Sequence, residues 1–263
     1  MTRTLKIVVA YDGTRFVGWQ RQPEGLSVQA LLEEGLSRLE GRPVTVTGAG
    51  RTDAGVHALG QVASVRLNHP ISTADLARAL NAMLPPDVRV LAVEEAGEGF
   101  HARYSAREKT YRYLLACGEP PGPFEWRYAW HVPYSLSVER MAAAARSVEG
   151  EHDFSAFRSA GSATATSRRR VSQSSLAPVT FREAFGWAVY PEHRVAGAQL
   201  LCYEVTGNGF LRHMVRAIVG SLVEVGSGRR EPEWFEELLR PADRAEAGPT
   251  APACGLFLVG VGY

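Results

Sequence analysis

The stretch GAGRTDAGVHALGQ, residues 48–61, places four glycines around one arginine and one acid. Glycine reaches backbone angles that other residues avoid, and ordering it costs more conformational entropy. So much glycine in one segment predicts a backbone bent into a special shape. Such a bend would hold the side chains of Arg51 and Asp53 in fixed directions, with His57 as a third candidate.

This glycine stretch lacks the pattern of a nucleotide-binding loop. The Walker pattern requires G-K-[ST], which is absent, and the dinucleotide pattern requires a glycine where Asp53 stands and a helix after the turn. The residues that follow, VASVRL at 62–67, alternate in polarity and predict a strand. The stretch is therefore expected to be a loop between two strands, without a helix N-terminus to hold a diphosphate.

Asp53 is the only acidic residue between Gly41 and Ala74. Most glycosidases use two carboxylates, so a glycosidase site has no local support, and only a distant second carboxylate stays open. A serine hydrolase is disfavoured because the chain lacks a G-x-S-x-G nucleophile elbow. The alternative to a catalytic role is an Arg51–Asp53 pair that only braces a turn.

A second cluster, HARYSAREKTYR at residues 101–112, combines four formal positive charges with one acid and two tyrosines. Basic side chains bind phosphates, and tyrosine rings stack on unpaired bases. A surface for RNA is the functional interpretation. A solvated strand edge with half-buried tyrosines is the alternative.

Further basic residues lie in two places. Arg158 and residues 168–170 form one basic cluster, and the region 159–175, which is rich in small and polar residues, is predicted to be a mobile loop. Such a loop suits a phosphate backbone, with an ordinary solvated loop as the alternative. Arg212 and Arg216 lie on the flank of the apolar face of a helix predicted over 211–223. An arginine there reaches solvent or turns inward toward a buried acid.

The sequence predicts strands and helices in two halves. Strands are expected at 5–11, 44–47, 62–67, 88–93, 110–116, 185–190 and 199–206. Besides the helix at 211–223, helices are expected to begin at Ser27, Thr73, Ser137 and Pro232. Without a strict β-α-β alternation, these elements argue for an α+β fold with a mainly antiparallel sheet.

Composition gives weaker indications. The formal net charge is +1, so overall charge does not indicate a nucleic-acid-binding protein. Only Lys6 and Lys109 are lysines among 29 basic residues. Arginine suits bidentate phosphate binding and stacking on bases, although GC-rich coding explains the same bias.

The cysteines and the N-terminal residues narrow the cellular context. Cys117, Cys202 and Cys254 are widely spaced and form no C-x-x-C pair, so neither a disulfide framework nor a zinc site is expected. The N-terminal residues lack the apolar run of a signal peptide, and no segment could span a membrane. A reduced cytoplasm is the expected location.

Five segments together resemble the tRNA pseudouridine synthase A (TruA) family. They are YDGTRFVGWQ (11–20), GAGRTDAGVHALGQ (48–61), FHARYSAREKTYRY (100–113), GNGFLRHMVR (207–216) and APACGL (251–256). The resemblance implies an α+β fold of two similar halves, 1–104 and 105–263. These form a long, mainly antiparallel central sheet flanked by helices, with a basic cleft between the halves. It also implies isomerisation of uridine to pseudouridine at positions 38, 39 and 40 of the tRNA anticodon stem-loop, by a homodimer without a cofactor.

The resemblance also suggests roles for individual residues. Asp53 would be the nucleophile or essential carboxylate, and Arg216 the arginine that keeps it ionised in a dry pocket. Tyr111 would stack on the flipped base. Arg51 would contact RNA or fill the space that the extruded uridine leaves. Arg103 and Arg107 would hold phosphates.

One residue departs from the family pattern, and two other function classes stay open. Arg212 stands where many members have an aromatic residue or histidine, which favours Arg216 as the functional arginine of that helix. An RNA-binding module without chemistry would not need Asp53 for its activity. A structural protein would need Asp53 for folding.

Overall fold

The computed structural model describes residues 2–159, 166–185 and 199–263. The chain forms two compact units, Met1–Lys109 with Phe257–Tyr263, and Thr110–Leu256. The sequence-based division fell between residues 104 and 105 and assigned the C-terminal residues to the second half. In the structure, the last strand belongs with the first unit, because it pairs with a strand of that unit.

The first unit is built on the strands β1 (Arg3–Tyr11), β2 (Thr47–Gly48), β3 (His57–Leu67), β4 (Val88–Ala96) and β10 (Leu256–Gly262). Their order is β4-β1-β3-β10, with β2 beside β3. Strand β1 is antiparallel to both β3 and β4, whereas β10 runs parallel to β3. Alternate residues of β1 are buried, which gives this strand one core face: Leu5, Ile7, Val9 and Tyr11.

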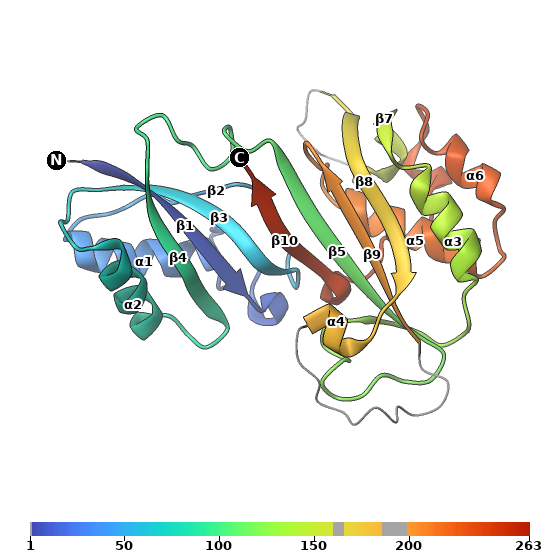
Figure 1. Ribbon diagram of the computed structural model, residues 1–263, viewed down its shortest axis with the longest axis horizontal. Coiled ribbons are helices and arrows are strands. Elements are labelled where there is room, and N and C mark those ends of the chain that lie inside the picture. Colours follow the sequence, from blue (N-terminus) through green and yellow to red (C-terminus); the bar gives the residue numbers. More distant parts are fainter. Residues whose placement is uncertain (1, 160–165, 186–198) are drawn as a thin grey trace. The chain divides into compact units, whose positions relative to one another are not determined.

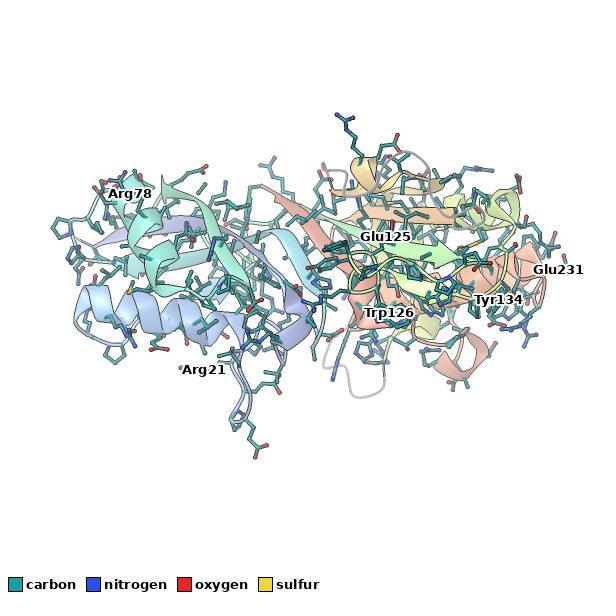
Figure 2. The ribbon with its side chains drawn as sticks, turned by 90° about the horizontal axis from the view of Figure 1, so that it is seen from below. Arg21, Arg78, Glu125, Trp126, Tyr134 and Glu231 are labelled. Atoms are coloured by element: carbon teal, nitrogen blue, oxygen red, sulfur yellow. The ribbon has the colours of Figure 1, made fainter. Side chains whose placement is uncertain are left out.

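Two helices, α1 (Val28–Glu40) and α2 (Thr73–Met83), pack against each other in the first unit (Figure 1). The hydroxyl of Ser27 caps α1, and Gly41 ends it in the left-handed region with φ 72°. Helix α2 is capped by Ser72, one residue before the predicted Thr73. Arg78 lies on the exposed side of α2, where it pairs with Asp75 (Figure 2). A 3-10 helix, η1 (Gly13–Arg15), follows β1.

The second unit contains β5 (Glu108–Cys117), β6 (Trp130–Val132), β7 (Gly150–Asp153), β8 (Arg168–Pro178) and β9 (Gln199–Gly207). The order is β5-β9-β8-β7, with β6 parallel to β5. Strand β8 is antiparallel to both β7 and β9. The segment between β5 and β6 carries the exposed Trp126 next to the buried Glu125 (Figure 2).

Helices α3 (Val138–Arg146), α4 (Phe181–Phe185), α5 (Met214–Gly226) and α6 (Pro232–Glu237) complete the second unit (Figure 1). Helix α3 packs on β8 and on α5. Helix α5 is buried along most of its length, as its apolar sequence predicts, and Ser137 and Pro232 start their helices as expected. Short 3-10 helices lie at Ser155–Phe157, Arg244–Glu246 and Ala253–Gly255.

The predicted α+β class and mainly antiparallel sheet are confirmed in both units. The predicted mobile loop over 159–175 is wrong from Arg168 onward, because these residues form β8. Arg168, Arg169 and Arg170 pair with Asp153, His152 and Glu151 of β7. Residues 160–165, and the predicted strand over 185–190 beyond Phe185, lie outside the described residues.

The predicted basic cleft between the halves stays a prediction. None of the helices in the described ranges is long and apolar enough to cross a membrane.

Candidate active site

Asp53 lies in a tight loop between β2 and β3, which we call the Asp53 loop (residues 49–56). At its start, the amide of Ala49 donates to the carbonyl of Val62 at 2.7 Å. Around the turn, the amide of Val56 donates to the carbonyl of Asp53 at 3.1 Å, and Gly55 takes a φ of 77°. The predicted strand–loop–strand arrangement is confirmed, and glycine is needed at position 55 because of its positive φ.

The segment 11–20 holds this loop from the side. The amide of Trp19 donates to the carbonyl of Thr52 at 3.1 Å, and the amide of Gly55 donates to the carbonyl of Phe16 at 3.3 Å. These two contacts fix the main chain on both sides of Asp53. Asp53 itself is half-buried and keeps part of its surface open to solvent.

Close approach of the two segments requires glycine in the segment 11–20. A Cβ atom on Gly13 would lie 2.0 Å from the carbonyl oxygen of Val56. A Cβ atom on Gly18 would lie 2.5 Å from the carbonyl oxygen of Thr52, and Gly18 has a φ of 113°. Gly13 and Gly18 of segment 11–20 therefore allow this segment to pack closely against the Asp53 loop.

Beneath the loop, the hydroxyls of Tyr11 and Thr52 share a hydrogen bond of 2.8 Å. Burial raises the pKa of Tyr11 to about 12, although hydrogen bonds with Thr52 and Gln61 lower it in part. Tyr11 is therefore neutral at physiological pH. Gln61 also donates to the carbonyl of Gly50 at 2.9 Å.

His57 is buried directly behind the loop. Its Nδ1 accepts a hydrogen bond of 3.0 Å from the amide of Gly13 and lies 3.2 Å from a carboxylate oxygen of Asp12. Its ring stacks on Phe257 at 4.7 Å between centroids. The sequence indicated a fixed direction for His57. In the structure, this residue at the start of β3 contacts Gly13, which follows β1, and Phe257 near the start of β10.

The basic residues of the first unit fall into two groups. Most have a carboxylate or a main-chain carbonyl as partner: Arg3, Lys6, Arg15, Arg21, Arg38, Arg42, Arg66, Arg78 and Arg89. Among the described residues, the side chains of Arg51, Arg103, Arg107 and Lys109 have neither. Three of these four are predicted site residues, and Lys109 is a residue that the sequence analysis did not select.

The neighbourhood of Arg103 is cationic and aromatic. Its guanidinium carbon lies 5.7 Å from the ring centroid of Tyr104, and the ring of His101 stacks on the same tyrosine at 4.3 Å. Tyr104 is 77% exposed. Arg51 and Arg107 are exposed as well, so their charges are open to solvent and to a ligand.

In the second unit, Tyr111 lies on β5 and is only 8% exposed. Its ring meets that of Phe210 edge to face, with centroids 5.0 Å apart and planes at 76°. Phe210 belongs to the resembling segment 207–216. Most of the Tyr111 ring is thus held in place, and a small part of its surface is open.

Arg216 lies on α5 and is fixed by the segment 248–252. Its Nε donates to the carbonyl of Ala251 at 2.6 Å, and the amide of Ala251 donates to the carbonyl of Arg216 at 3.1 Å. A Cβ atom on Gly220 would lie 1.7 Å from the carbonyl oxygen of Pro249. The two last resembling segments are therefore packed together, and Arg216 is their point of contact.

The N-terminus of α5 separates Arg212 from Arg216. Arg212 is exposed, and its carbonyl accepts from the amide of Ser159 at 3.2 Å. His213 follows with a φ of 64° and caps the helix, an uncommon conformation for a residue other than glycine. Within the described ranges, no group of three or more His, Cys, Asp or Glu side chains could hold a metal ion.

The predicted site residues belong to different compact units. Asp53, Arg51, Arg103 and Arg107 belong to the first unit, whereas Tyr111 and Arg216 belong to the second. The pairing of Asp53 with Arg216 stays a prediction.

Residues 7–105 and 144–263 match a protein family described as tRNA pseudouridine synthase. The chain belongs to this family.

Curated relatives named tRNA pseudouridine synthase A cover almost the whole chain. The protein of Solibacter usitatus is 43% identical over 99% of this chain and 100% of its own length. That of Geobacter sulfurreducens is 41% identical over 97% and 98%, and that of Pelobacter propionicus is 40% identical over 99% and 100%. Among solved structures, a Cbf5-Nop10-Gar1 complex is a weak match, with a TM-score of 0.33 and 16% identity over 83% of this chain and 45% of that chain.

Membership of the tRNA pseudouridine synthase family confirms the resemblance seen in the sequence. The roles of the single site residues stay predictions. The structure adds residues that sequence reasoning missed, namely Tyr11 and Thr52 beneath the loop and Lys109 beside it. All three lie in segments that the sequence analysis singled out, Tyr11 in 11–20, Thr52 in 48–61 and Lys109 in the basic cluster 101–112, but no pattern selected them individually.

Proposed function

We propose that this chain isomerises uridine to pseudouridine at positions 38, 39 and 40 of the tRNA anticodon stem-loop. Family membership and relatives of up to 43% identity along the whole chain support the proposal. The observation that carries it is the Asp53 loop, whose main chain is fixed on both sides of a half-buried carboxylate. Such fixation is costly for a surface turn and useful for a reacting group.

The reaction exchanges one bond for another within a single nucleotide. The bond between C1′ of the ribose and N1 of uracil breaks, the uracil turns, and C1′ bonds to C5. C5 loses its proton and N1 gains one, so that the product has the same atoms and electrons as the substrate. Because nothing is oxidised or transferred between molecules, we propose that the reaction needs no cofactor.

Asp53 is proposed as the essential carboxylate, either as a nucleophile or as an electrostatic partner of the reacting base or sugar. The bends at Gly18 and Gly55 bring the main chain of residues 52–55 close to segment 11–20, and hydrogen bonds with this segment restrain the main chain on both sides of Asp53. Arg216 is proposed to favour the ionised carboxylate, because a cation near an acid stabilises its charged form. The bond to Ala251 restricts the guanidinium in advance.

Tyr111 is proposed to stack on the uracil after the nucleotide has left the RNA helix. Its contact with Phe210 fixes the ring plane, so less side-chain entropy is lost when the base arrives. Stacking on an aromatic ring does not require a particular base pair, which suits an enzyme that acts at three neighbouring positions.

The cations that have neither a carboxylate nor a main-chain carbonyl as partner among the described residues are proposed to bind the RNA backbone. Arg51, Arg103 and Arg107 carry three such charges on the first unit. Phosphates would neutralise them and release counterions, so affinity should fall with salt. We also propose that the protein acts in the cytoplasm as a homodimer, in which one tRNA contacts both subunits.

A direct test incubates the purified protein with an unmodified tRNA transcript and maps pseudouridine by chemical derivatisation. We expect modification at uridines 38–40 and none in a transcript with cytidine at these positions. Protein treated with a chelator should retain its activity. A tRNA that stays unmodified under all conditions, although the protein is folded, would contradict the proposal. The proposed homodimer is tested separately by light scattering.

A further inference from the structure

Lys109 stands out among the charged residues of the first unit. It lies within the basic cluster 101–112 and ends the longer of the two segments that form this unit. A Cβ atom built on Gly50 would lie 3.5 Å from Cε of Lys109 and 3.8 Å from its Nζ. The lysine side chain therefore lies along the main chain of the Asp53 loop. Gly50 is three residues before Asp53, at most about 11 Å along an extended chain.

The electrostatic surroundings of Lys109 are unfavourable in the protein alone. Burial lowers the pKa of Lys109, and the charge of Arg103 lowers it further. No carboxylate pairs with Lys109 within the described ranges of the chain. Half-buried cations in proteins normally have a partner of opposite charge, because desolvation of an unpaired charge is costly. The balancing anion is therefore expected to come from a ligand.

The other lysine shows what an ordinary position looks like. Lys6 on β1 forms an ion pair of 3.2 Å with Glu94 and lies 5.6 Å from the ring centroid of Tyr263. Its charge is balanced within the protein. Of the two lysines in this unit, Lys6 thus pairs with a carboxylate, whereas Lys109 does not pair with one among the described residues.

We propose that Lys109 and Arg103 bind a single phosphate of the RNA backbone, next to the nucleotide that reaches Asp53. This inference rests on the proposed function. Phosphates are the only anionic groups that unmodified RNA offers, and one phosphate between the two cations would relieve their mutual repulsion. A lysine suits this position because its compact ammonium group is a point charge at the end of a flexible stem. The contact would set the register of the RNA along the Asp53 loop.

The test uses anticodon stem-loop RNAs in which one linkage near the target uridine is a neutral methylphosphonate. Each is compared with an RNA that has an ordinary phosphate at the same place, and both carry a 2′-deoxy sugar there for chemical stability. The wild-type protein should lose about tenfold in affinity at one linkage. Lys109→Met keeps the length of the side chain and removes the charge. It should bind the all-phosphate RNA about tenfold more weakly and respond little to that linkage.

Lys6→Met is the matched control, because it also removes a lysine charge from the first unit. It should show the wild-type profile across all linkages. If Lys109→Met keeps wild-type affinity, or stays as sensitive as the wild type at every linkage, the inference is wrong. If Lys109→Met does not fold, Arg103→Gln replaces it, because Arg103 is exposed and is proposed to bind the same phosphate. In this variant, the methylphosphonate at that linkage should reduce affinity less than in the wild type. An unchanged profile in Arg103→Gln would then overturn the inference.

The outcomes separate this inference from the proposed function. If the wild-type protein modifies tRNA, and both variants show the same dependence on each linkage as the wild type, only the inference about the phosphate site is wrong. Wild-type protein that neither binds nor modifies the stem-loop would overturn both.

Discussion

Asp53 and Arg216 are both held in place by hydrogen bonds, but these bonds involve different parts of the two residues. Around Asp53, main-chain hydrogen bonds with segment 11–20 hold the residues on both sides, and Gly13 and Gly18 allow the close approach. At Arg216, the guanidinium itself donates to the carbonyl of Ala251. Substitutions near Asp53 should therefore act through the backbone, whereas substitutions of Arg216 should act through the geometry of its side chain.

The largest effect on folding is expected for Gly18→Ala. Alanine at a φ of 113° is strained, and its Cβ would lie 2.5 Å from the carbonyl oxygen of Thr52. Together, strain and overpacking should lower the free energy of unfolding by about 2–4 kcal/mol. Thermal and denaturant unfolding measure this change.

Gly41→Ala is the control for Gly18→Ala. Gly41 also has a positive φ, but nothing lies within 4 Å of an added Cβ. It should cost about 1–2 kcal/mol, which is the strain of the left-handed backbone alone. Equal costs for the two variants would show that the carbonyl of Thr52 does not obstruct a Cβ at position 18.

The next effect is expected for Arg216→Lys, which keeps the charge. Lysine lacks the Nε donor and the planar group, so it cannot reproduce the geometry of the hydrogen bond to Ala251. We expect a decrease in kcat of about tenfold or more, because the cation is no longer held in a fixed position. KM should change less. Wild-type kcat in this variant would mean that charge alone suffices.

A smaller effect is expected for Tyr11→Phe. The substitution removes the hydroxyl that pairs with Thr52 beneath the loop and should cost about 1–2 kcal/mol of stability. Activity should fall by less than in Arg216→Lys, since the main-chain contacts of the loop remain.

The same variant makes a prediction about pH. Tyr11 has a pKa of about 12 in the folded protein against 10.0 for an ordinary tyrosine. The neutral hydroxyl is thus favoured by folding, and its contribution is complete below pH 10 and lost as the pH rises toward about 12. In Tyr11→Phe, the decline in stability should be shallower by about 1.4 kcal/mol per pH unit in this range. If the free energy of unfolding falls equally steeply with pH in the wild type and in Tyr11→Phe, the raised pKa of Tyr11 is contradicted.

The smallest effect is expected in the arginines of β8. Because successive strand residues point to opposite faces, Arg168 and Arg170 share one face and Arg169 has the other. If the exposed pair binds phosphates, the double alanine variant should reduce the slope of log affinity against log salt by about 0.9 for each phosphate that is no longer neutralised. Arg169→Ala and Arg78→Ala should leave the slope unchanged. A double variant with the wild-type slope would make this face ordinary solvated surface.

Local sequence signals predicted the starts of several helices, although α4 was missed and α5 begins at Met214, three residues after the predicted start. Ser27, Ser137 and Pro232 start their helices, and Gly41 ends the first one, because capping depends on residues close in sequence. Strand β8 was missed because its residues are polar and its strand conformation comes from pairing with β7 and β9. The pairing of β10 with β3 is equally distant in sequence, so no local pattern shows it.

The candidate site was predicted in part. The glycine pattern indicated the Asp53 loop correctly, since positive φ angles and close approach demand glycine. The support from Tyr11 and Trp19 could not be derived, because these residues reach the loop only through the fold. Lys109 needed the structure too, because its lack of a partner is a property of its surroundings and not of its motif.

Turnover by Asp53→Asn at saturating tRNA shows whether the Asp53 carboxylate is essential for catalysis. The substitution keeps the size of the side chain and removes its charge. We expect folded protein that binds tRNA with near wild-type affinity and forms pseudouridine at least about 10³-fold more slowly. Asp87→Asn, which removes a carboxylate paired with the exposed Arg15, should retain wild-type turnover. A folded Asp53→Asn protein with turnover close to that of the wild type would contradict the catalytic role of Asp53.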